Sequence, residues 1–363
     1  MRQQYLMSSR SFFIIFALFF SVAVTAQSTI SGQVVDAETK LPLQGASVFA
    51  QNTTKGVVTD KEGNYRLFLN KGGYELIISF TGFVSERINV EANEDKRLDI
   101  ALKPEDKSME AVVITASNEV ADGWEKHGSF FLDHFIGATP LSDSCILINP
   151  EVLKFYYYKR SDRLKVLATE PLQIANKSLG YNLRYQLDSF VYFYKTNINS
   201  YRGNCLYTEM EGDSIQKREW NDNRRQAYLG SRIHFLRAYY DSTLKPEGFT
   251  VDMLSTTDAN KFNRLVNYYD KRYYSFEDST GNAALSFTKK VSISYAKKAP
   301  EKDYLEQYNL PPDVSLQISY VDLLAPITIK PNGFFLDQNS WINQGYWSWK
   351  NVADQLPYDY EPE

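Results

Sequence analysis

The sequence is poor in the residues that hold metals and build disulfide frameworks. Its 363 residues include two cysteines and three histidines. Small secreted domains that depend on disulfides are far richer in cysteine, and a catalytic zinc site usually takes two histidines among its protein ligands. None of His127, His134 and His234 begins a His-x-x-Glu motif. We therefore expect no metal and no cofactor.

The chain also lacks an excess of positive charge. Its net charge is −4 at pH 7 and its pI is about 5.6. A nucleic-acid-binding domain presents a basic stripe, whereas basic pairs such as Lys159-Arg160 and Arg224-Arg225 lie among acidic or aromatic residues. The charge pattern therefore predicts no nucleic-acid partner.

Motifs of several enzyme classes are absent as well. The sequence has no Gly-x-Ser-x-Gly elbow, no Walker-type phosphate loop and no Rossmann glycine pattern. A glycosidase needs only two suitably spaced carboxylates, and Glu209, Glu211 and Asp213 share a face of an expected strand. We favour a non-enzymatic protein with no catalytic residues. A hydrolase of glycans or peptides that uses paired carboxylates remains the alternative.

Long apolar runs are missing after residue 27, but one precedes it. Arg2 and Arg10 precede an apolar stretch from Phe12 to Val24. The stretch ends in the small residues Val24-Thr25-Ala26. This pattern predicts a signal peptide at residues 1–26, cleaved after Ala26. An uncleaved anchor is the alternative, although the run is short for a membrane span. We expect an exported protein, in the periplasm or at the outer membrane, with no transmembrane helix after cleavage.

Aromatic residues, in contrast, are abundant, with 26 Tyr and 22 Phe. Both types favour strands. Residues 28–104 read as short strands separated by turn residues at intervals of roughly ten positions, which is typical of a β-sandwich or barrel. The turn residues are Pro42, Gly45, Asp60, Gly63, Gly72, Gly73 and Gly82.

Five segments of this region carry a resemblance to a known family. They are residues 30–36 (ISGQVVD), 42–48 (PLQGASV), 56–60 (GVVTD), 63–65 (GNY) and 78–83 (ISFTGF). Together they resemble the carboxypeptidase regulatory-like domain of Bacteroidota-type cell envelopes. The resemblance implies a seven-stranded, transthyretin-like β-sandwich over residues 28–104. It also implies a location in the cell envelope, but it does not imply a chemical reaction.

A linker is expected at residues 105–118, because the stretch from Lys103 to Glu110 is charged and contains Pro104. It contains Ala111 to Ala116 (AVVITA), which is similar to the TonB box that follows this module in TonB-dependent receptors. The remaining chain is too short for a plug and a large barrel. A TonB-coupled outer-membrane component is therefore a further alternative.

Residues 119–363 are expected to form a β-rich α+β domain, which makes the whole chain mainly β. The apolar spacing predicts helices over Glu119 to Ile136 and Asn221 to Tyr240. Residues 135–153, 227–237 and 345–360 resemble a region found in carboxypeptidase regulatory-like domain-containing proteins of the same bacteria. No biochemical activity is assigned to that region, so the resemblance does not indicate what the second domain does.

The two cysteines leave two possibilities open. Cys145 and Cys205 could form one disulfide in an oxidising compartment, or they could be two buried thiols. Taken together, the features of the sequence predict a non-catalytic binding or scaffolding protein of the cell envelope. Its partner is an envelope protein or a glycan.

Overall fold

The computed structural model describes residues 27–105, 118–255, 261–277, 281–336 and 338–362. The chain is mainly β, as predicted, with 41% of the described residues in strands and 20% in helices. Buried apolar residues of the described part of the chain form three clusters, of which the cluster of the curved sheet also takes in residues near the C-terminal end such as Val352 and Ala353. The predicted signal peptide, residues 1–26, and the segment Ala111 to Ala116 lie outside the described residues.

The first part is the expected β-sandwich. Its sheets have the orders β4-β1-β7, with β8 also on β1, and β3-β2-β5-β6. Because β7 and β8 pair with successive parts of β1 in one register, they form a single interrupted edge strand, and the sandwich has the seven strands predicted. The elements are β1 (Ser28–Asp36), β2 (Ser47–Ala50), β3 (Gly56–Val58), β4 (Asn64–Leu69), β5 (Gly72–Ser79), β6 (Glu86–Ala92), β7 (Lys96–Arg97) and β8 (Ile100–Leu102).

The turn before β4 forms as its sequence predicts. The Asp60 carboxylate accepts hydrogen bonds from the Glu62 and Asn64 amides at 3.0 and 2.7 Å. Gly63 has φ +74°, and a Cβ there would lie 2.6 Å from the Val34 carbonyl oxygen. Glycine is therefore required at this position both by conformation and by space.

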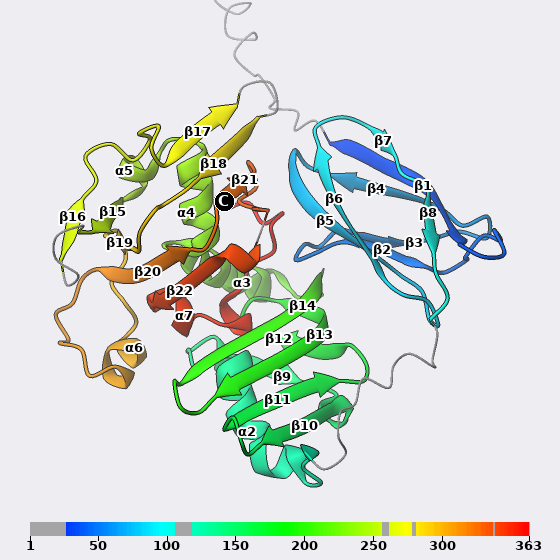
Figure 1. Cartoon of the computed structure of the whole chain (residues 1–363), viewed down its shortest axis with the longest axis horizontal. Coiled ribbons are helices and arrows are strands. Elements are labelled where there is room, and N and C mark those ends of the chain that lie inside the picture. Colours follow the sequence, from blue (N-terminus) through cyan, green and yellow to red (C-terminus); the bar gives the residue numbers. More distant parts are fainter. Residues whose placement is uncertain (1–26, 106–117, 256–260, 278–280, 337, 363) are drawn as a thin grey trace, which may run out of the picture.

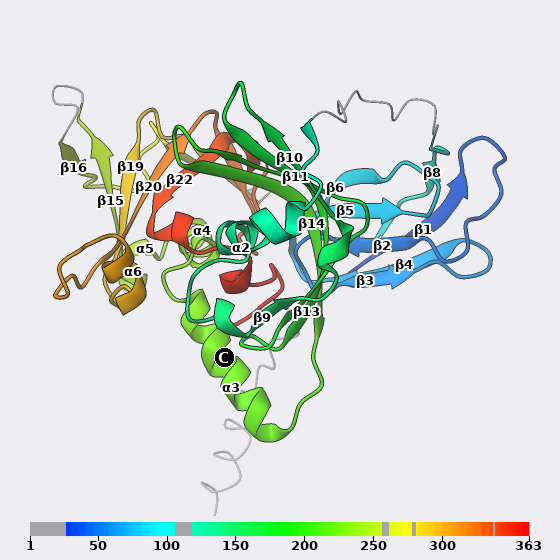
Figure 2. The ribbon, with the colours of Figure 1, turned by 90° about the horizontal axis from the view of Figure 1, so that it is seen from below.

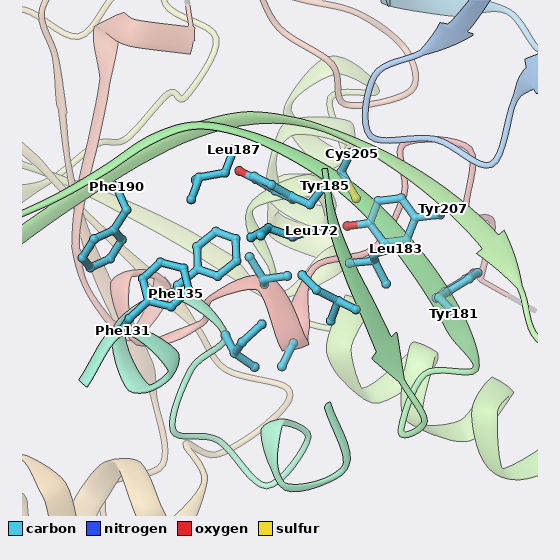
Figure 3. Packing of buried hydrophobic residues seen from close by; sticks show 14 of the residues in the cluster. Phe131, Phe135, Leu172, Tyr181, Leu183, Tyr185, Leu187, Phe190, Cys205 and Tyr207 are labelled. Atoms are coloured by element: carbon cyan, nitrogen blue, oxygen red, sulfur yellow. The ribbon is translucent and has the colours of Figure 1, made fainter. Parts of the chain in front are cut away.

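The second part is a six-stranded antiparallel sheet curved around one helix, α2 (Figures 1 and 2). Phe131 and Phe135 of α2 are fully buried against aromatic residues of the sheet, including Tyr185 and Phe190 (Figure 3). The elements are α2 (Gly123–Phe135), η2 (Ser142–Ser144), β9 (Cys145–Leu147), η3 (Pro150–Val152), β10 (Leu153–Tyr158), β11 (Arg163–Ala168), β12 (Leu172–Asn176), β13 (Tyr181–Phe193) and β14 (Ile198–Glu209).

The third part holds a second core in the region expected to be one domain. Its five-stranded sheet has the order β16-β15-β19-β20-β22, and β17-β18-β21 form a smaller sheet. The elements are α5 (Leu244–Glu247), β15 (Phe249–Leu254), β16 (Phe262–Arg264), β17 (Tyr274–Glu277), β18 (Asn282–Leu285), β19 (Val291–Tyr295), α6 (Lys302–Gln307), β20 (Gln317–Leu323), β21 (Ile327–Ile329), η4 (Gln338–Ser340), β22 (Trp341–Gly345), α7 (Tyr346–Trp349) and η5 (Val352–Asp354).

The helix predicted over Asn221 to Tyr240 is wrong in its bounds, because two helices occupy this region. They are α3 (Ser214–Tyr228) and α4 (Arg232–Tyr240). Gly230 between them has φ +79°, which a continuing helix cannot accommodate. Ser231 then caps α4 by accepting a hydrogen bond from the His234 amide at 3.2 Å. The cap of α3 is Asp213, upstream of the predicted start.

The sandwich is joined to the other parts through its β2–β3 loop. The Asn52 amide donates to the Cys205 carbonyl at 2.7 Å, and the Tyr207 amide donates to the Thr53 carbonyl at 2.9 Å. The C-terminal tail closes over the same loop, since the Tyr358 amide donates to the Asn52 carbonyl at 2.7 Å. In the part of the chain that the structure describes, no helix has the length and apolarity needed to span a bilayer.

Candidate functional site

A cavity of about 1640 Å³ lies where the three parts of the chain meet. The sandwich contributes Gln51, Glu75 and Arg87 to its wall, and the curved sheet contributes residues 196–203. The third part contributes residues 341–344 and 346–351. No single part builds this central cavity, so its shape depends on how all three are joined.

The wall of the central cavity is rich in aromatic and amide side chains. Such a wall can cover apolar surface of a ligand and also bond its polar groups. The site therefore suits a polar organic ligand. The aromatic residues include Tyr192, Tyr201, Tyr308, Trp341, Trp347 and Trp349, and the amides include Gln51, Asn89, Asn199, Gln307, Asn343 and Gln355.

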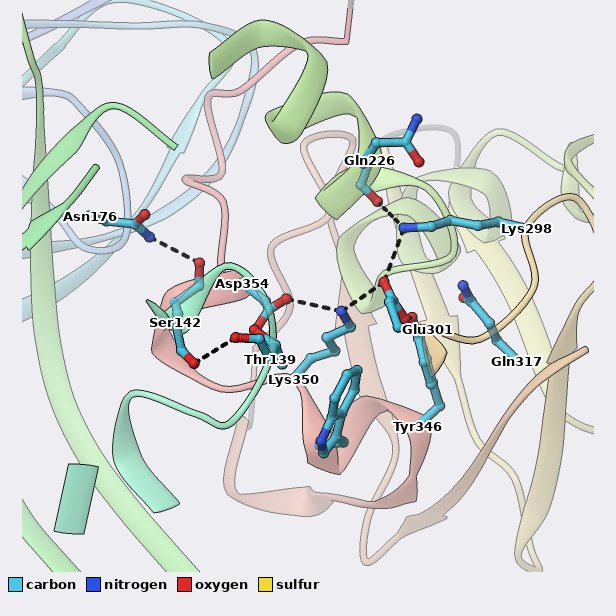
Figure 4. Close-up of polar contacts among 12 residues, drawn as sticks. Thr139, Ser142, Asn176, Gln226, Lys298, Glu301, Gln317, Tyr346, Lys350 and Asp354 are labelled. Carbon is cyan, nitrogen blue, oxygen red and sulfur yellow. Dashed lines mark hydrogen bonds and ion pairs between the residues drawn. The ribbon is translucent and has the colours of Figure 1, made fainter. Parts of the chain in front are cut away.

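A network of charged side chains borders the cavity (Figure 4). Lys350 Nζ lies 3.0 Å from Asp354 Oδ1 and 3.1 Å from Glu301 Oε1. Thr139 Oγ1 donates to Asp354 Oδ2 at 2.8 Å, and the Tyr346 hydroxyl donates to Glu301 Oε2. The network connects the loop after α2, the residue before α6 and the segment from α7 to η5.

The two carboxylates of this network differ in their pKa. Burial raises the pKa of Asp354, and the contacts with Lys350 and Thr139 lower it only in part. Burial alone would raise the pKa of Glu301 too, but Lys350, the Tyr346 hydroxyl and Lys298 outweigh it and hold that pKa at about 2. Because both carboxylates are engaged by neighbouring donors, we interpret the network as structural support for the cavity.

The three histidines do not come together as a metal site. His134 lies at the cavity, with Nδ1 2.8 Å from the Phe130 carbonyl and its ring stacked on Phe130. His234 is buried, and its burial lowers its pKa although Glu247 opposes this. His127 stacks on Phe155. Across the described ranges, no group of three or more His, Cys, Asp or Glu side chains is arranged to hold a metal ion.

The carboxylates considered for a hydrolase serve other contacts. Glu209 forms an ion pair with Arg224 at 3.1 Å, and the Arg224 guanidinium lies 3.9 Å from the centre of the Tyr181 ring. Asp213 accepts from the first amides of α3 as its cap. Glu209 and Arg224 line a second cavity of about 390 Å³, but Glu211 and Asp213 do not. The structure therefore does not bring these three carboxylates to one cleft.

Of the two possibilities left open for Cys145 and Cys205, the structure does not contain the disulfide, and both thiols are free. Cys145 is on β9 and Cys205 is on β14, with β12 and β13 between them in the sheet. Three strand spacings amount to roughly 14 Å, whereas a disulfide needs Cα atoms within about 7 Å. The order of the strands in the sheet therefore keeps the two cysteines apart.

Sequence reasoning did not single out Glu301, Lys350 or Asp354. Their partners are far apart in the chain, with 215 positions between Thr139 and Asp354. One local signal was present, because Lys350 and Asp354 are spaced i, i+4 in the tail segment 345–360 that was noted only for its resemblance.

Comparison with known proteins identifies the first part of the chain. Residues 30–114 match the family model of the CarboxypepD_reg-like domain. A TonB-dependent receptor of Formosa agariphila is 32% identical over 110 residues, and the TonB-dependent receptor SusC of Bacteroides thetaiotaomicron is 31% identical over 108 residues. Each match covers 30% of this chain and 10% of the receptor. This chain therefore shares a small N-terminal portion with those much longer proteins.

Solved structures resemble the chain only in part. The 5-hydroxyisourate hydrolase of Klebsiella pneumoniae is 23% identical, with a TM-score of 0.20, and covers 22% of this chain and 92% of its own. The C-terminal domain of the shaft pilin SpaA of Lactobacillus rhamnosus is 16% identical, with a TM-score of 0.19, and covers 22% of this chain and 99% of its own. Scores this low carry no functional argument.

Proposed function

We propose that this chain is a non-catalytic binding protein of the cell envelope, and that the central cavity is its binding surface. The observation that carries the proposal is the construction of that cavity from all three parts of the chain, with aromatic and amide side chains on its wall. Binding sites are preferentially found where domains meet. An envelope protein or a glycan would be the partner.

Two of the acidic residues that line the cavity, Asp354 and Asp188, are engaged by neighbouring donors, which favours binding over catalysis at these positions. Asp354 is held by Lys350 and Thr139, and Asp188 is paired with Arg87 at 2.8 Å. A general acid or base needs to reach the reacting group with a proton or a free lone pair. Carboxylates engaged in this way are better suited to holding the cavity in shape.

The location in the envelope is supported by two features. The match of the first module to TonB-dependent receptors is one, and the predicted signal peptide at residues 1–26 is the other. The matched relatives are TonB-dependent receptors, which favours TonB coupling through Ala111 to Ala116 as a second candidate function. Deletion of residues 111–116 should then abolish binding to the purified periplasmic domain of TonB.

The binding role can be tested with a substitution that narrows the cavity. Ala138 lines the cavity and is exposed, so Ala138→Trp should fold and occupy part of the binding space. Ala101 on β8 is also exposed but does not line the cavity, and Ala101→Trp is the matched control. The full chain and both variants would be assayed on arrays of peptides and of oligosaccharides.

We expect a ligand that binds the wild type and Ala101→Trp and binds Ala138→Trp at least about tenfold more weakly. Equal binding by all three proteins would place the ligand elsewhere and contradict the proposal. Cleavage of an arrayed peptide or oligosaccharide by the wild type would contradict the non-catalytic role.

A further inference from the structure

We propose that the open edge of β14 at Asn199 and Tyr201 binds an extended peptide segment of a partner protein, which joins the curved sheet as an additional strand. This inference rests on the proposed function and gives its ligand a chemical class. It concerns main-chain hydrogen-bonding groups that face the central cavity rather than the side chains of its wall.

The pairing of β14 shows which of its main-chain groups are open. β14 pairs with β13 along its whole length and has no second neighbouring strand within the described residues. In an antiparallel pair, alternate residues turn both main-chain groups toward the neighbour and the others turn them away. The Cys205 carbonyl and the Tyr207 amide bond the β2–β3 loop, so odd-numbered residues of β14 face away from β13.

The far end of the strand leads to the same assignment. The Tyr194 amide donates to the Asp162 carbonyl, which shows that even-numbered residues at this end of β13 direct their main-chain groups toward β11. Tyr192 and Phe190 therefore bond β11, and the odd-numbered residue between them bonds β14. Asn199 and Tyr201 therefore direct their amides and carbonyls away from the sheet. Among the described residues, these outward groups have no hydrogen-bond partner.

The same edge already accepts a segment of extended chain. Thr53 of the β2–β3 loop forms a parallel bridge with Leu206, and Gln51 Nε2 donates to the Gly203 carbonyl at 3.1 Å. The sandwich thus occupies the edge from Gly203 onward and leaves Asn199 and Tyr201 uncovered. The proposed site is continuous with an interface that uses this mode of pairing.

Space for another strand is present beside the open groups. Residues 196–203 all line the central cavity, and the Ile198 side chain is 55% exposed. Another lining residue, Trp341, has a buried indole Nε1–H with no hydrogen-bond partner in the described part of the chain. A peptide carbonyl is a suitable acceptor for such a donor.

These features favour a peptide over a glycan. Successive outward residues on a strand recur at about 6.8 Å and each offers one donor and one acceptor. An extended polypeptide has the same repeat, so it can make up to four main-chain bonds with Asn199 and Tyr201. Peptide binding by strand addition takes its affinity from these bonds and its specificity from alternate side chains.

The test uses a proline that removes one outward amide. A 12-residue random peptide library would be selected against the full chain, and the selected peptide would be labelled for fluorescence anisotropy. We expect Asn199→Pro to bind it at least about tenfold more weakly, because proline lacks the N–H and its ring occupies the edge. Arg66→Pro is the matched control, since Arg66 is an exposed residue that faces outward on the open edge of β4, remote from the cavity.

Methylation of the peptide tests the same geometry without changing the protein. N-methylation at successive positions should weaken binding at every second residue, because only alternate amides of a pairing strand face β14. Selection of no peptide, equal binding by Asn199→Pro, or a methylation profile without alternation would overturn the inference. If oligosaccharides bind, Ala138→Trp blocks them and Asn199→Pro does not, the cavity is a binding site but the peptide assignment is wrong.

Discussion

Lys350 forms an ion pair with Asp354 that is almost closed to solvent, with the two side chains 20% and 3% exposed. Removing one member of a buried pair leaves the other charge without compensation. We expect Lys350→Met to lower the free energy of unfolding by about 3 kcal/mol, measured by urea denaturation of the full chain.

The control for this prediction is a lysine in an exposed pair. Lys302 and Glu306 lie 3.2 Å apart with side chains 84% and 65% exposed. Lys302→Met should change the free energy of unfolding by no more than about 0.5 kcal/mol. Similar effects of both substitutions would show that the buried pair contributes no more than a surface pair.

The lowered pKa of Glu301 predicts that the folded chain loses stability as the pH falls. Its pKa is about 2 in the folded chain against an ordinary value of 4.5. Its contribution to stability is therefore fully present above pH 4.5 and is lost as the pH falls toward 2. The stability difference between the wild type and Glu301→Gln should shrink over this interval, by about 3 kcal/mol at most.

Thermal unfolding at a series of pH values would measure this difference. Asp354, whose pKa is raised by burial and in part by Glu301, contributes with the opposite sign, so part of the measured difference comes from Asp354. Glu306→Gln is the control at an exposed carboxylate, whose side chain is 65% exposed. A Glu301→Gln difference that is constant between pH 5 and 2 would contradict the assignment.

At the scale of elements, the break between α3 and α4 depends on Gly230. A Cβ there would lie 2.3 Å from Gln317 Oε1 and 2.7 Å from Tyr295 Cδ1, in addition to the strain of φ +79°. We expect Gly230→Ala to destabilise the chain by about 3 kcal/mol in urea denaturation.

Gly281 provides the comparison, because it lies in the same part of the chain. Its φ is +62°, and the nearest atom to an added Cβ is the Tyr240 hydroxyl oxygen at 3.6 Å. Gly281→Ala should therefore cost only the backbone strain, about 1 kcal/mol. If the two alanine variants are equally stable, the close contacts around Gly230 add nothing to the loss of stability.

Local patterns predicted most strands but not how they continue or break. Residues 181–187 and 190–193 each alternate as separate strands would, but the structure joins them into β13 with a bulge between Leu187 and Ser189. A bulge depends on the partner strand, so the sequence of β13 alone cannot reveal it.

The candidate site was largely beyond sequence reasoning for the same reason. Its charged network joins residues separated by 45 to 215 positions, and its local pairs are Lys350–Asp354 at i, i+4 and Lys298–Glu301 at i, i+3. The open edge of β14 follows from strand order, which propensities do not specify. Composition did indicate an aromatic-rich protein, and the cavity wall agrees with it.

At the scale of the whole molecule, the sandwich has a core of its own. Fifteen buried residues, from Ile30 to Leu102, form a cluster separate from the other two. We therefore expect the fragment of residues 27–105 to fold alone, with β-type circular dichroism and one cooperative unfolding transition. A disordered fragment would mean that the sandwich depends on its contacts with the rest of the chain, such as those of Asn52, Thr53 and Gly73.

The tail that contacts all three parts makes the cavity sensitive to a single break in the chain. Its Ala353 amide bonds the Ile136 carbonyl, and Tyr358 bonds both Asn52 and Arg237 through its main chain. The same segment lines the cavity with Asp354, Gln355, Leu356 and Tyr358. One proteolytic cut just before residue 353 would therefore weaken contacts of all three parts and open the cavity wall at once, while leaving the Asn52–Cys205 and Thr53–Tyr207 bonds in place.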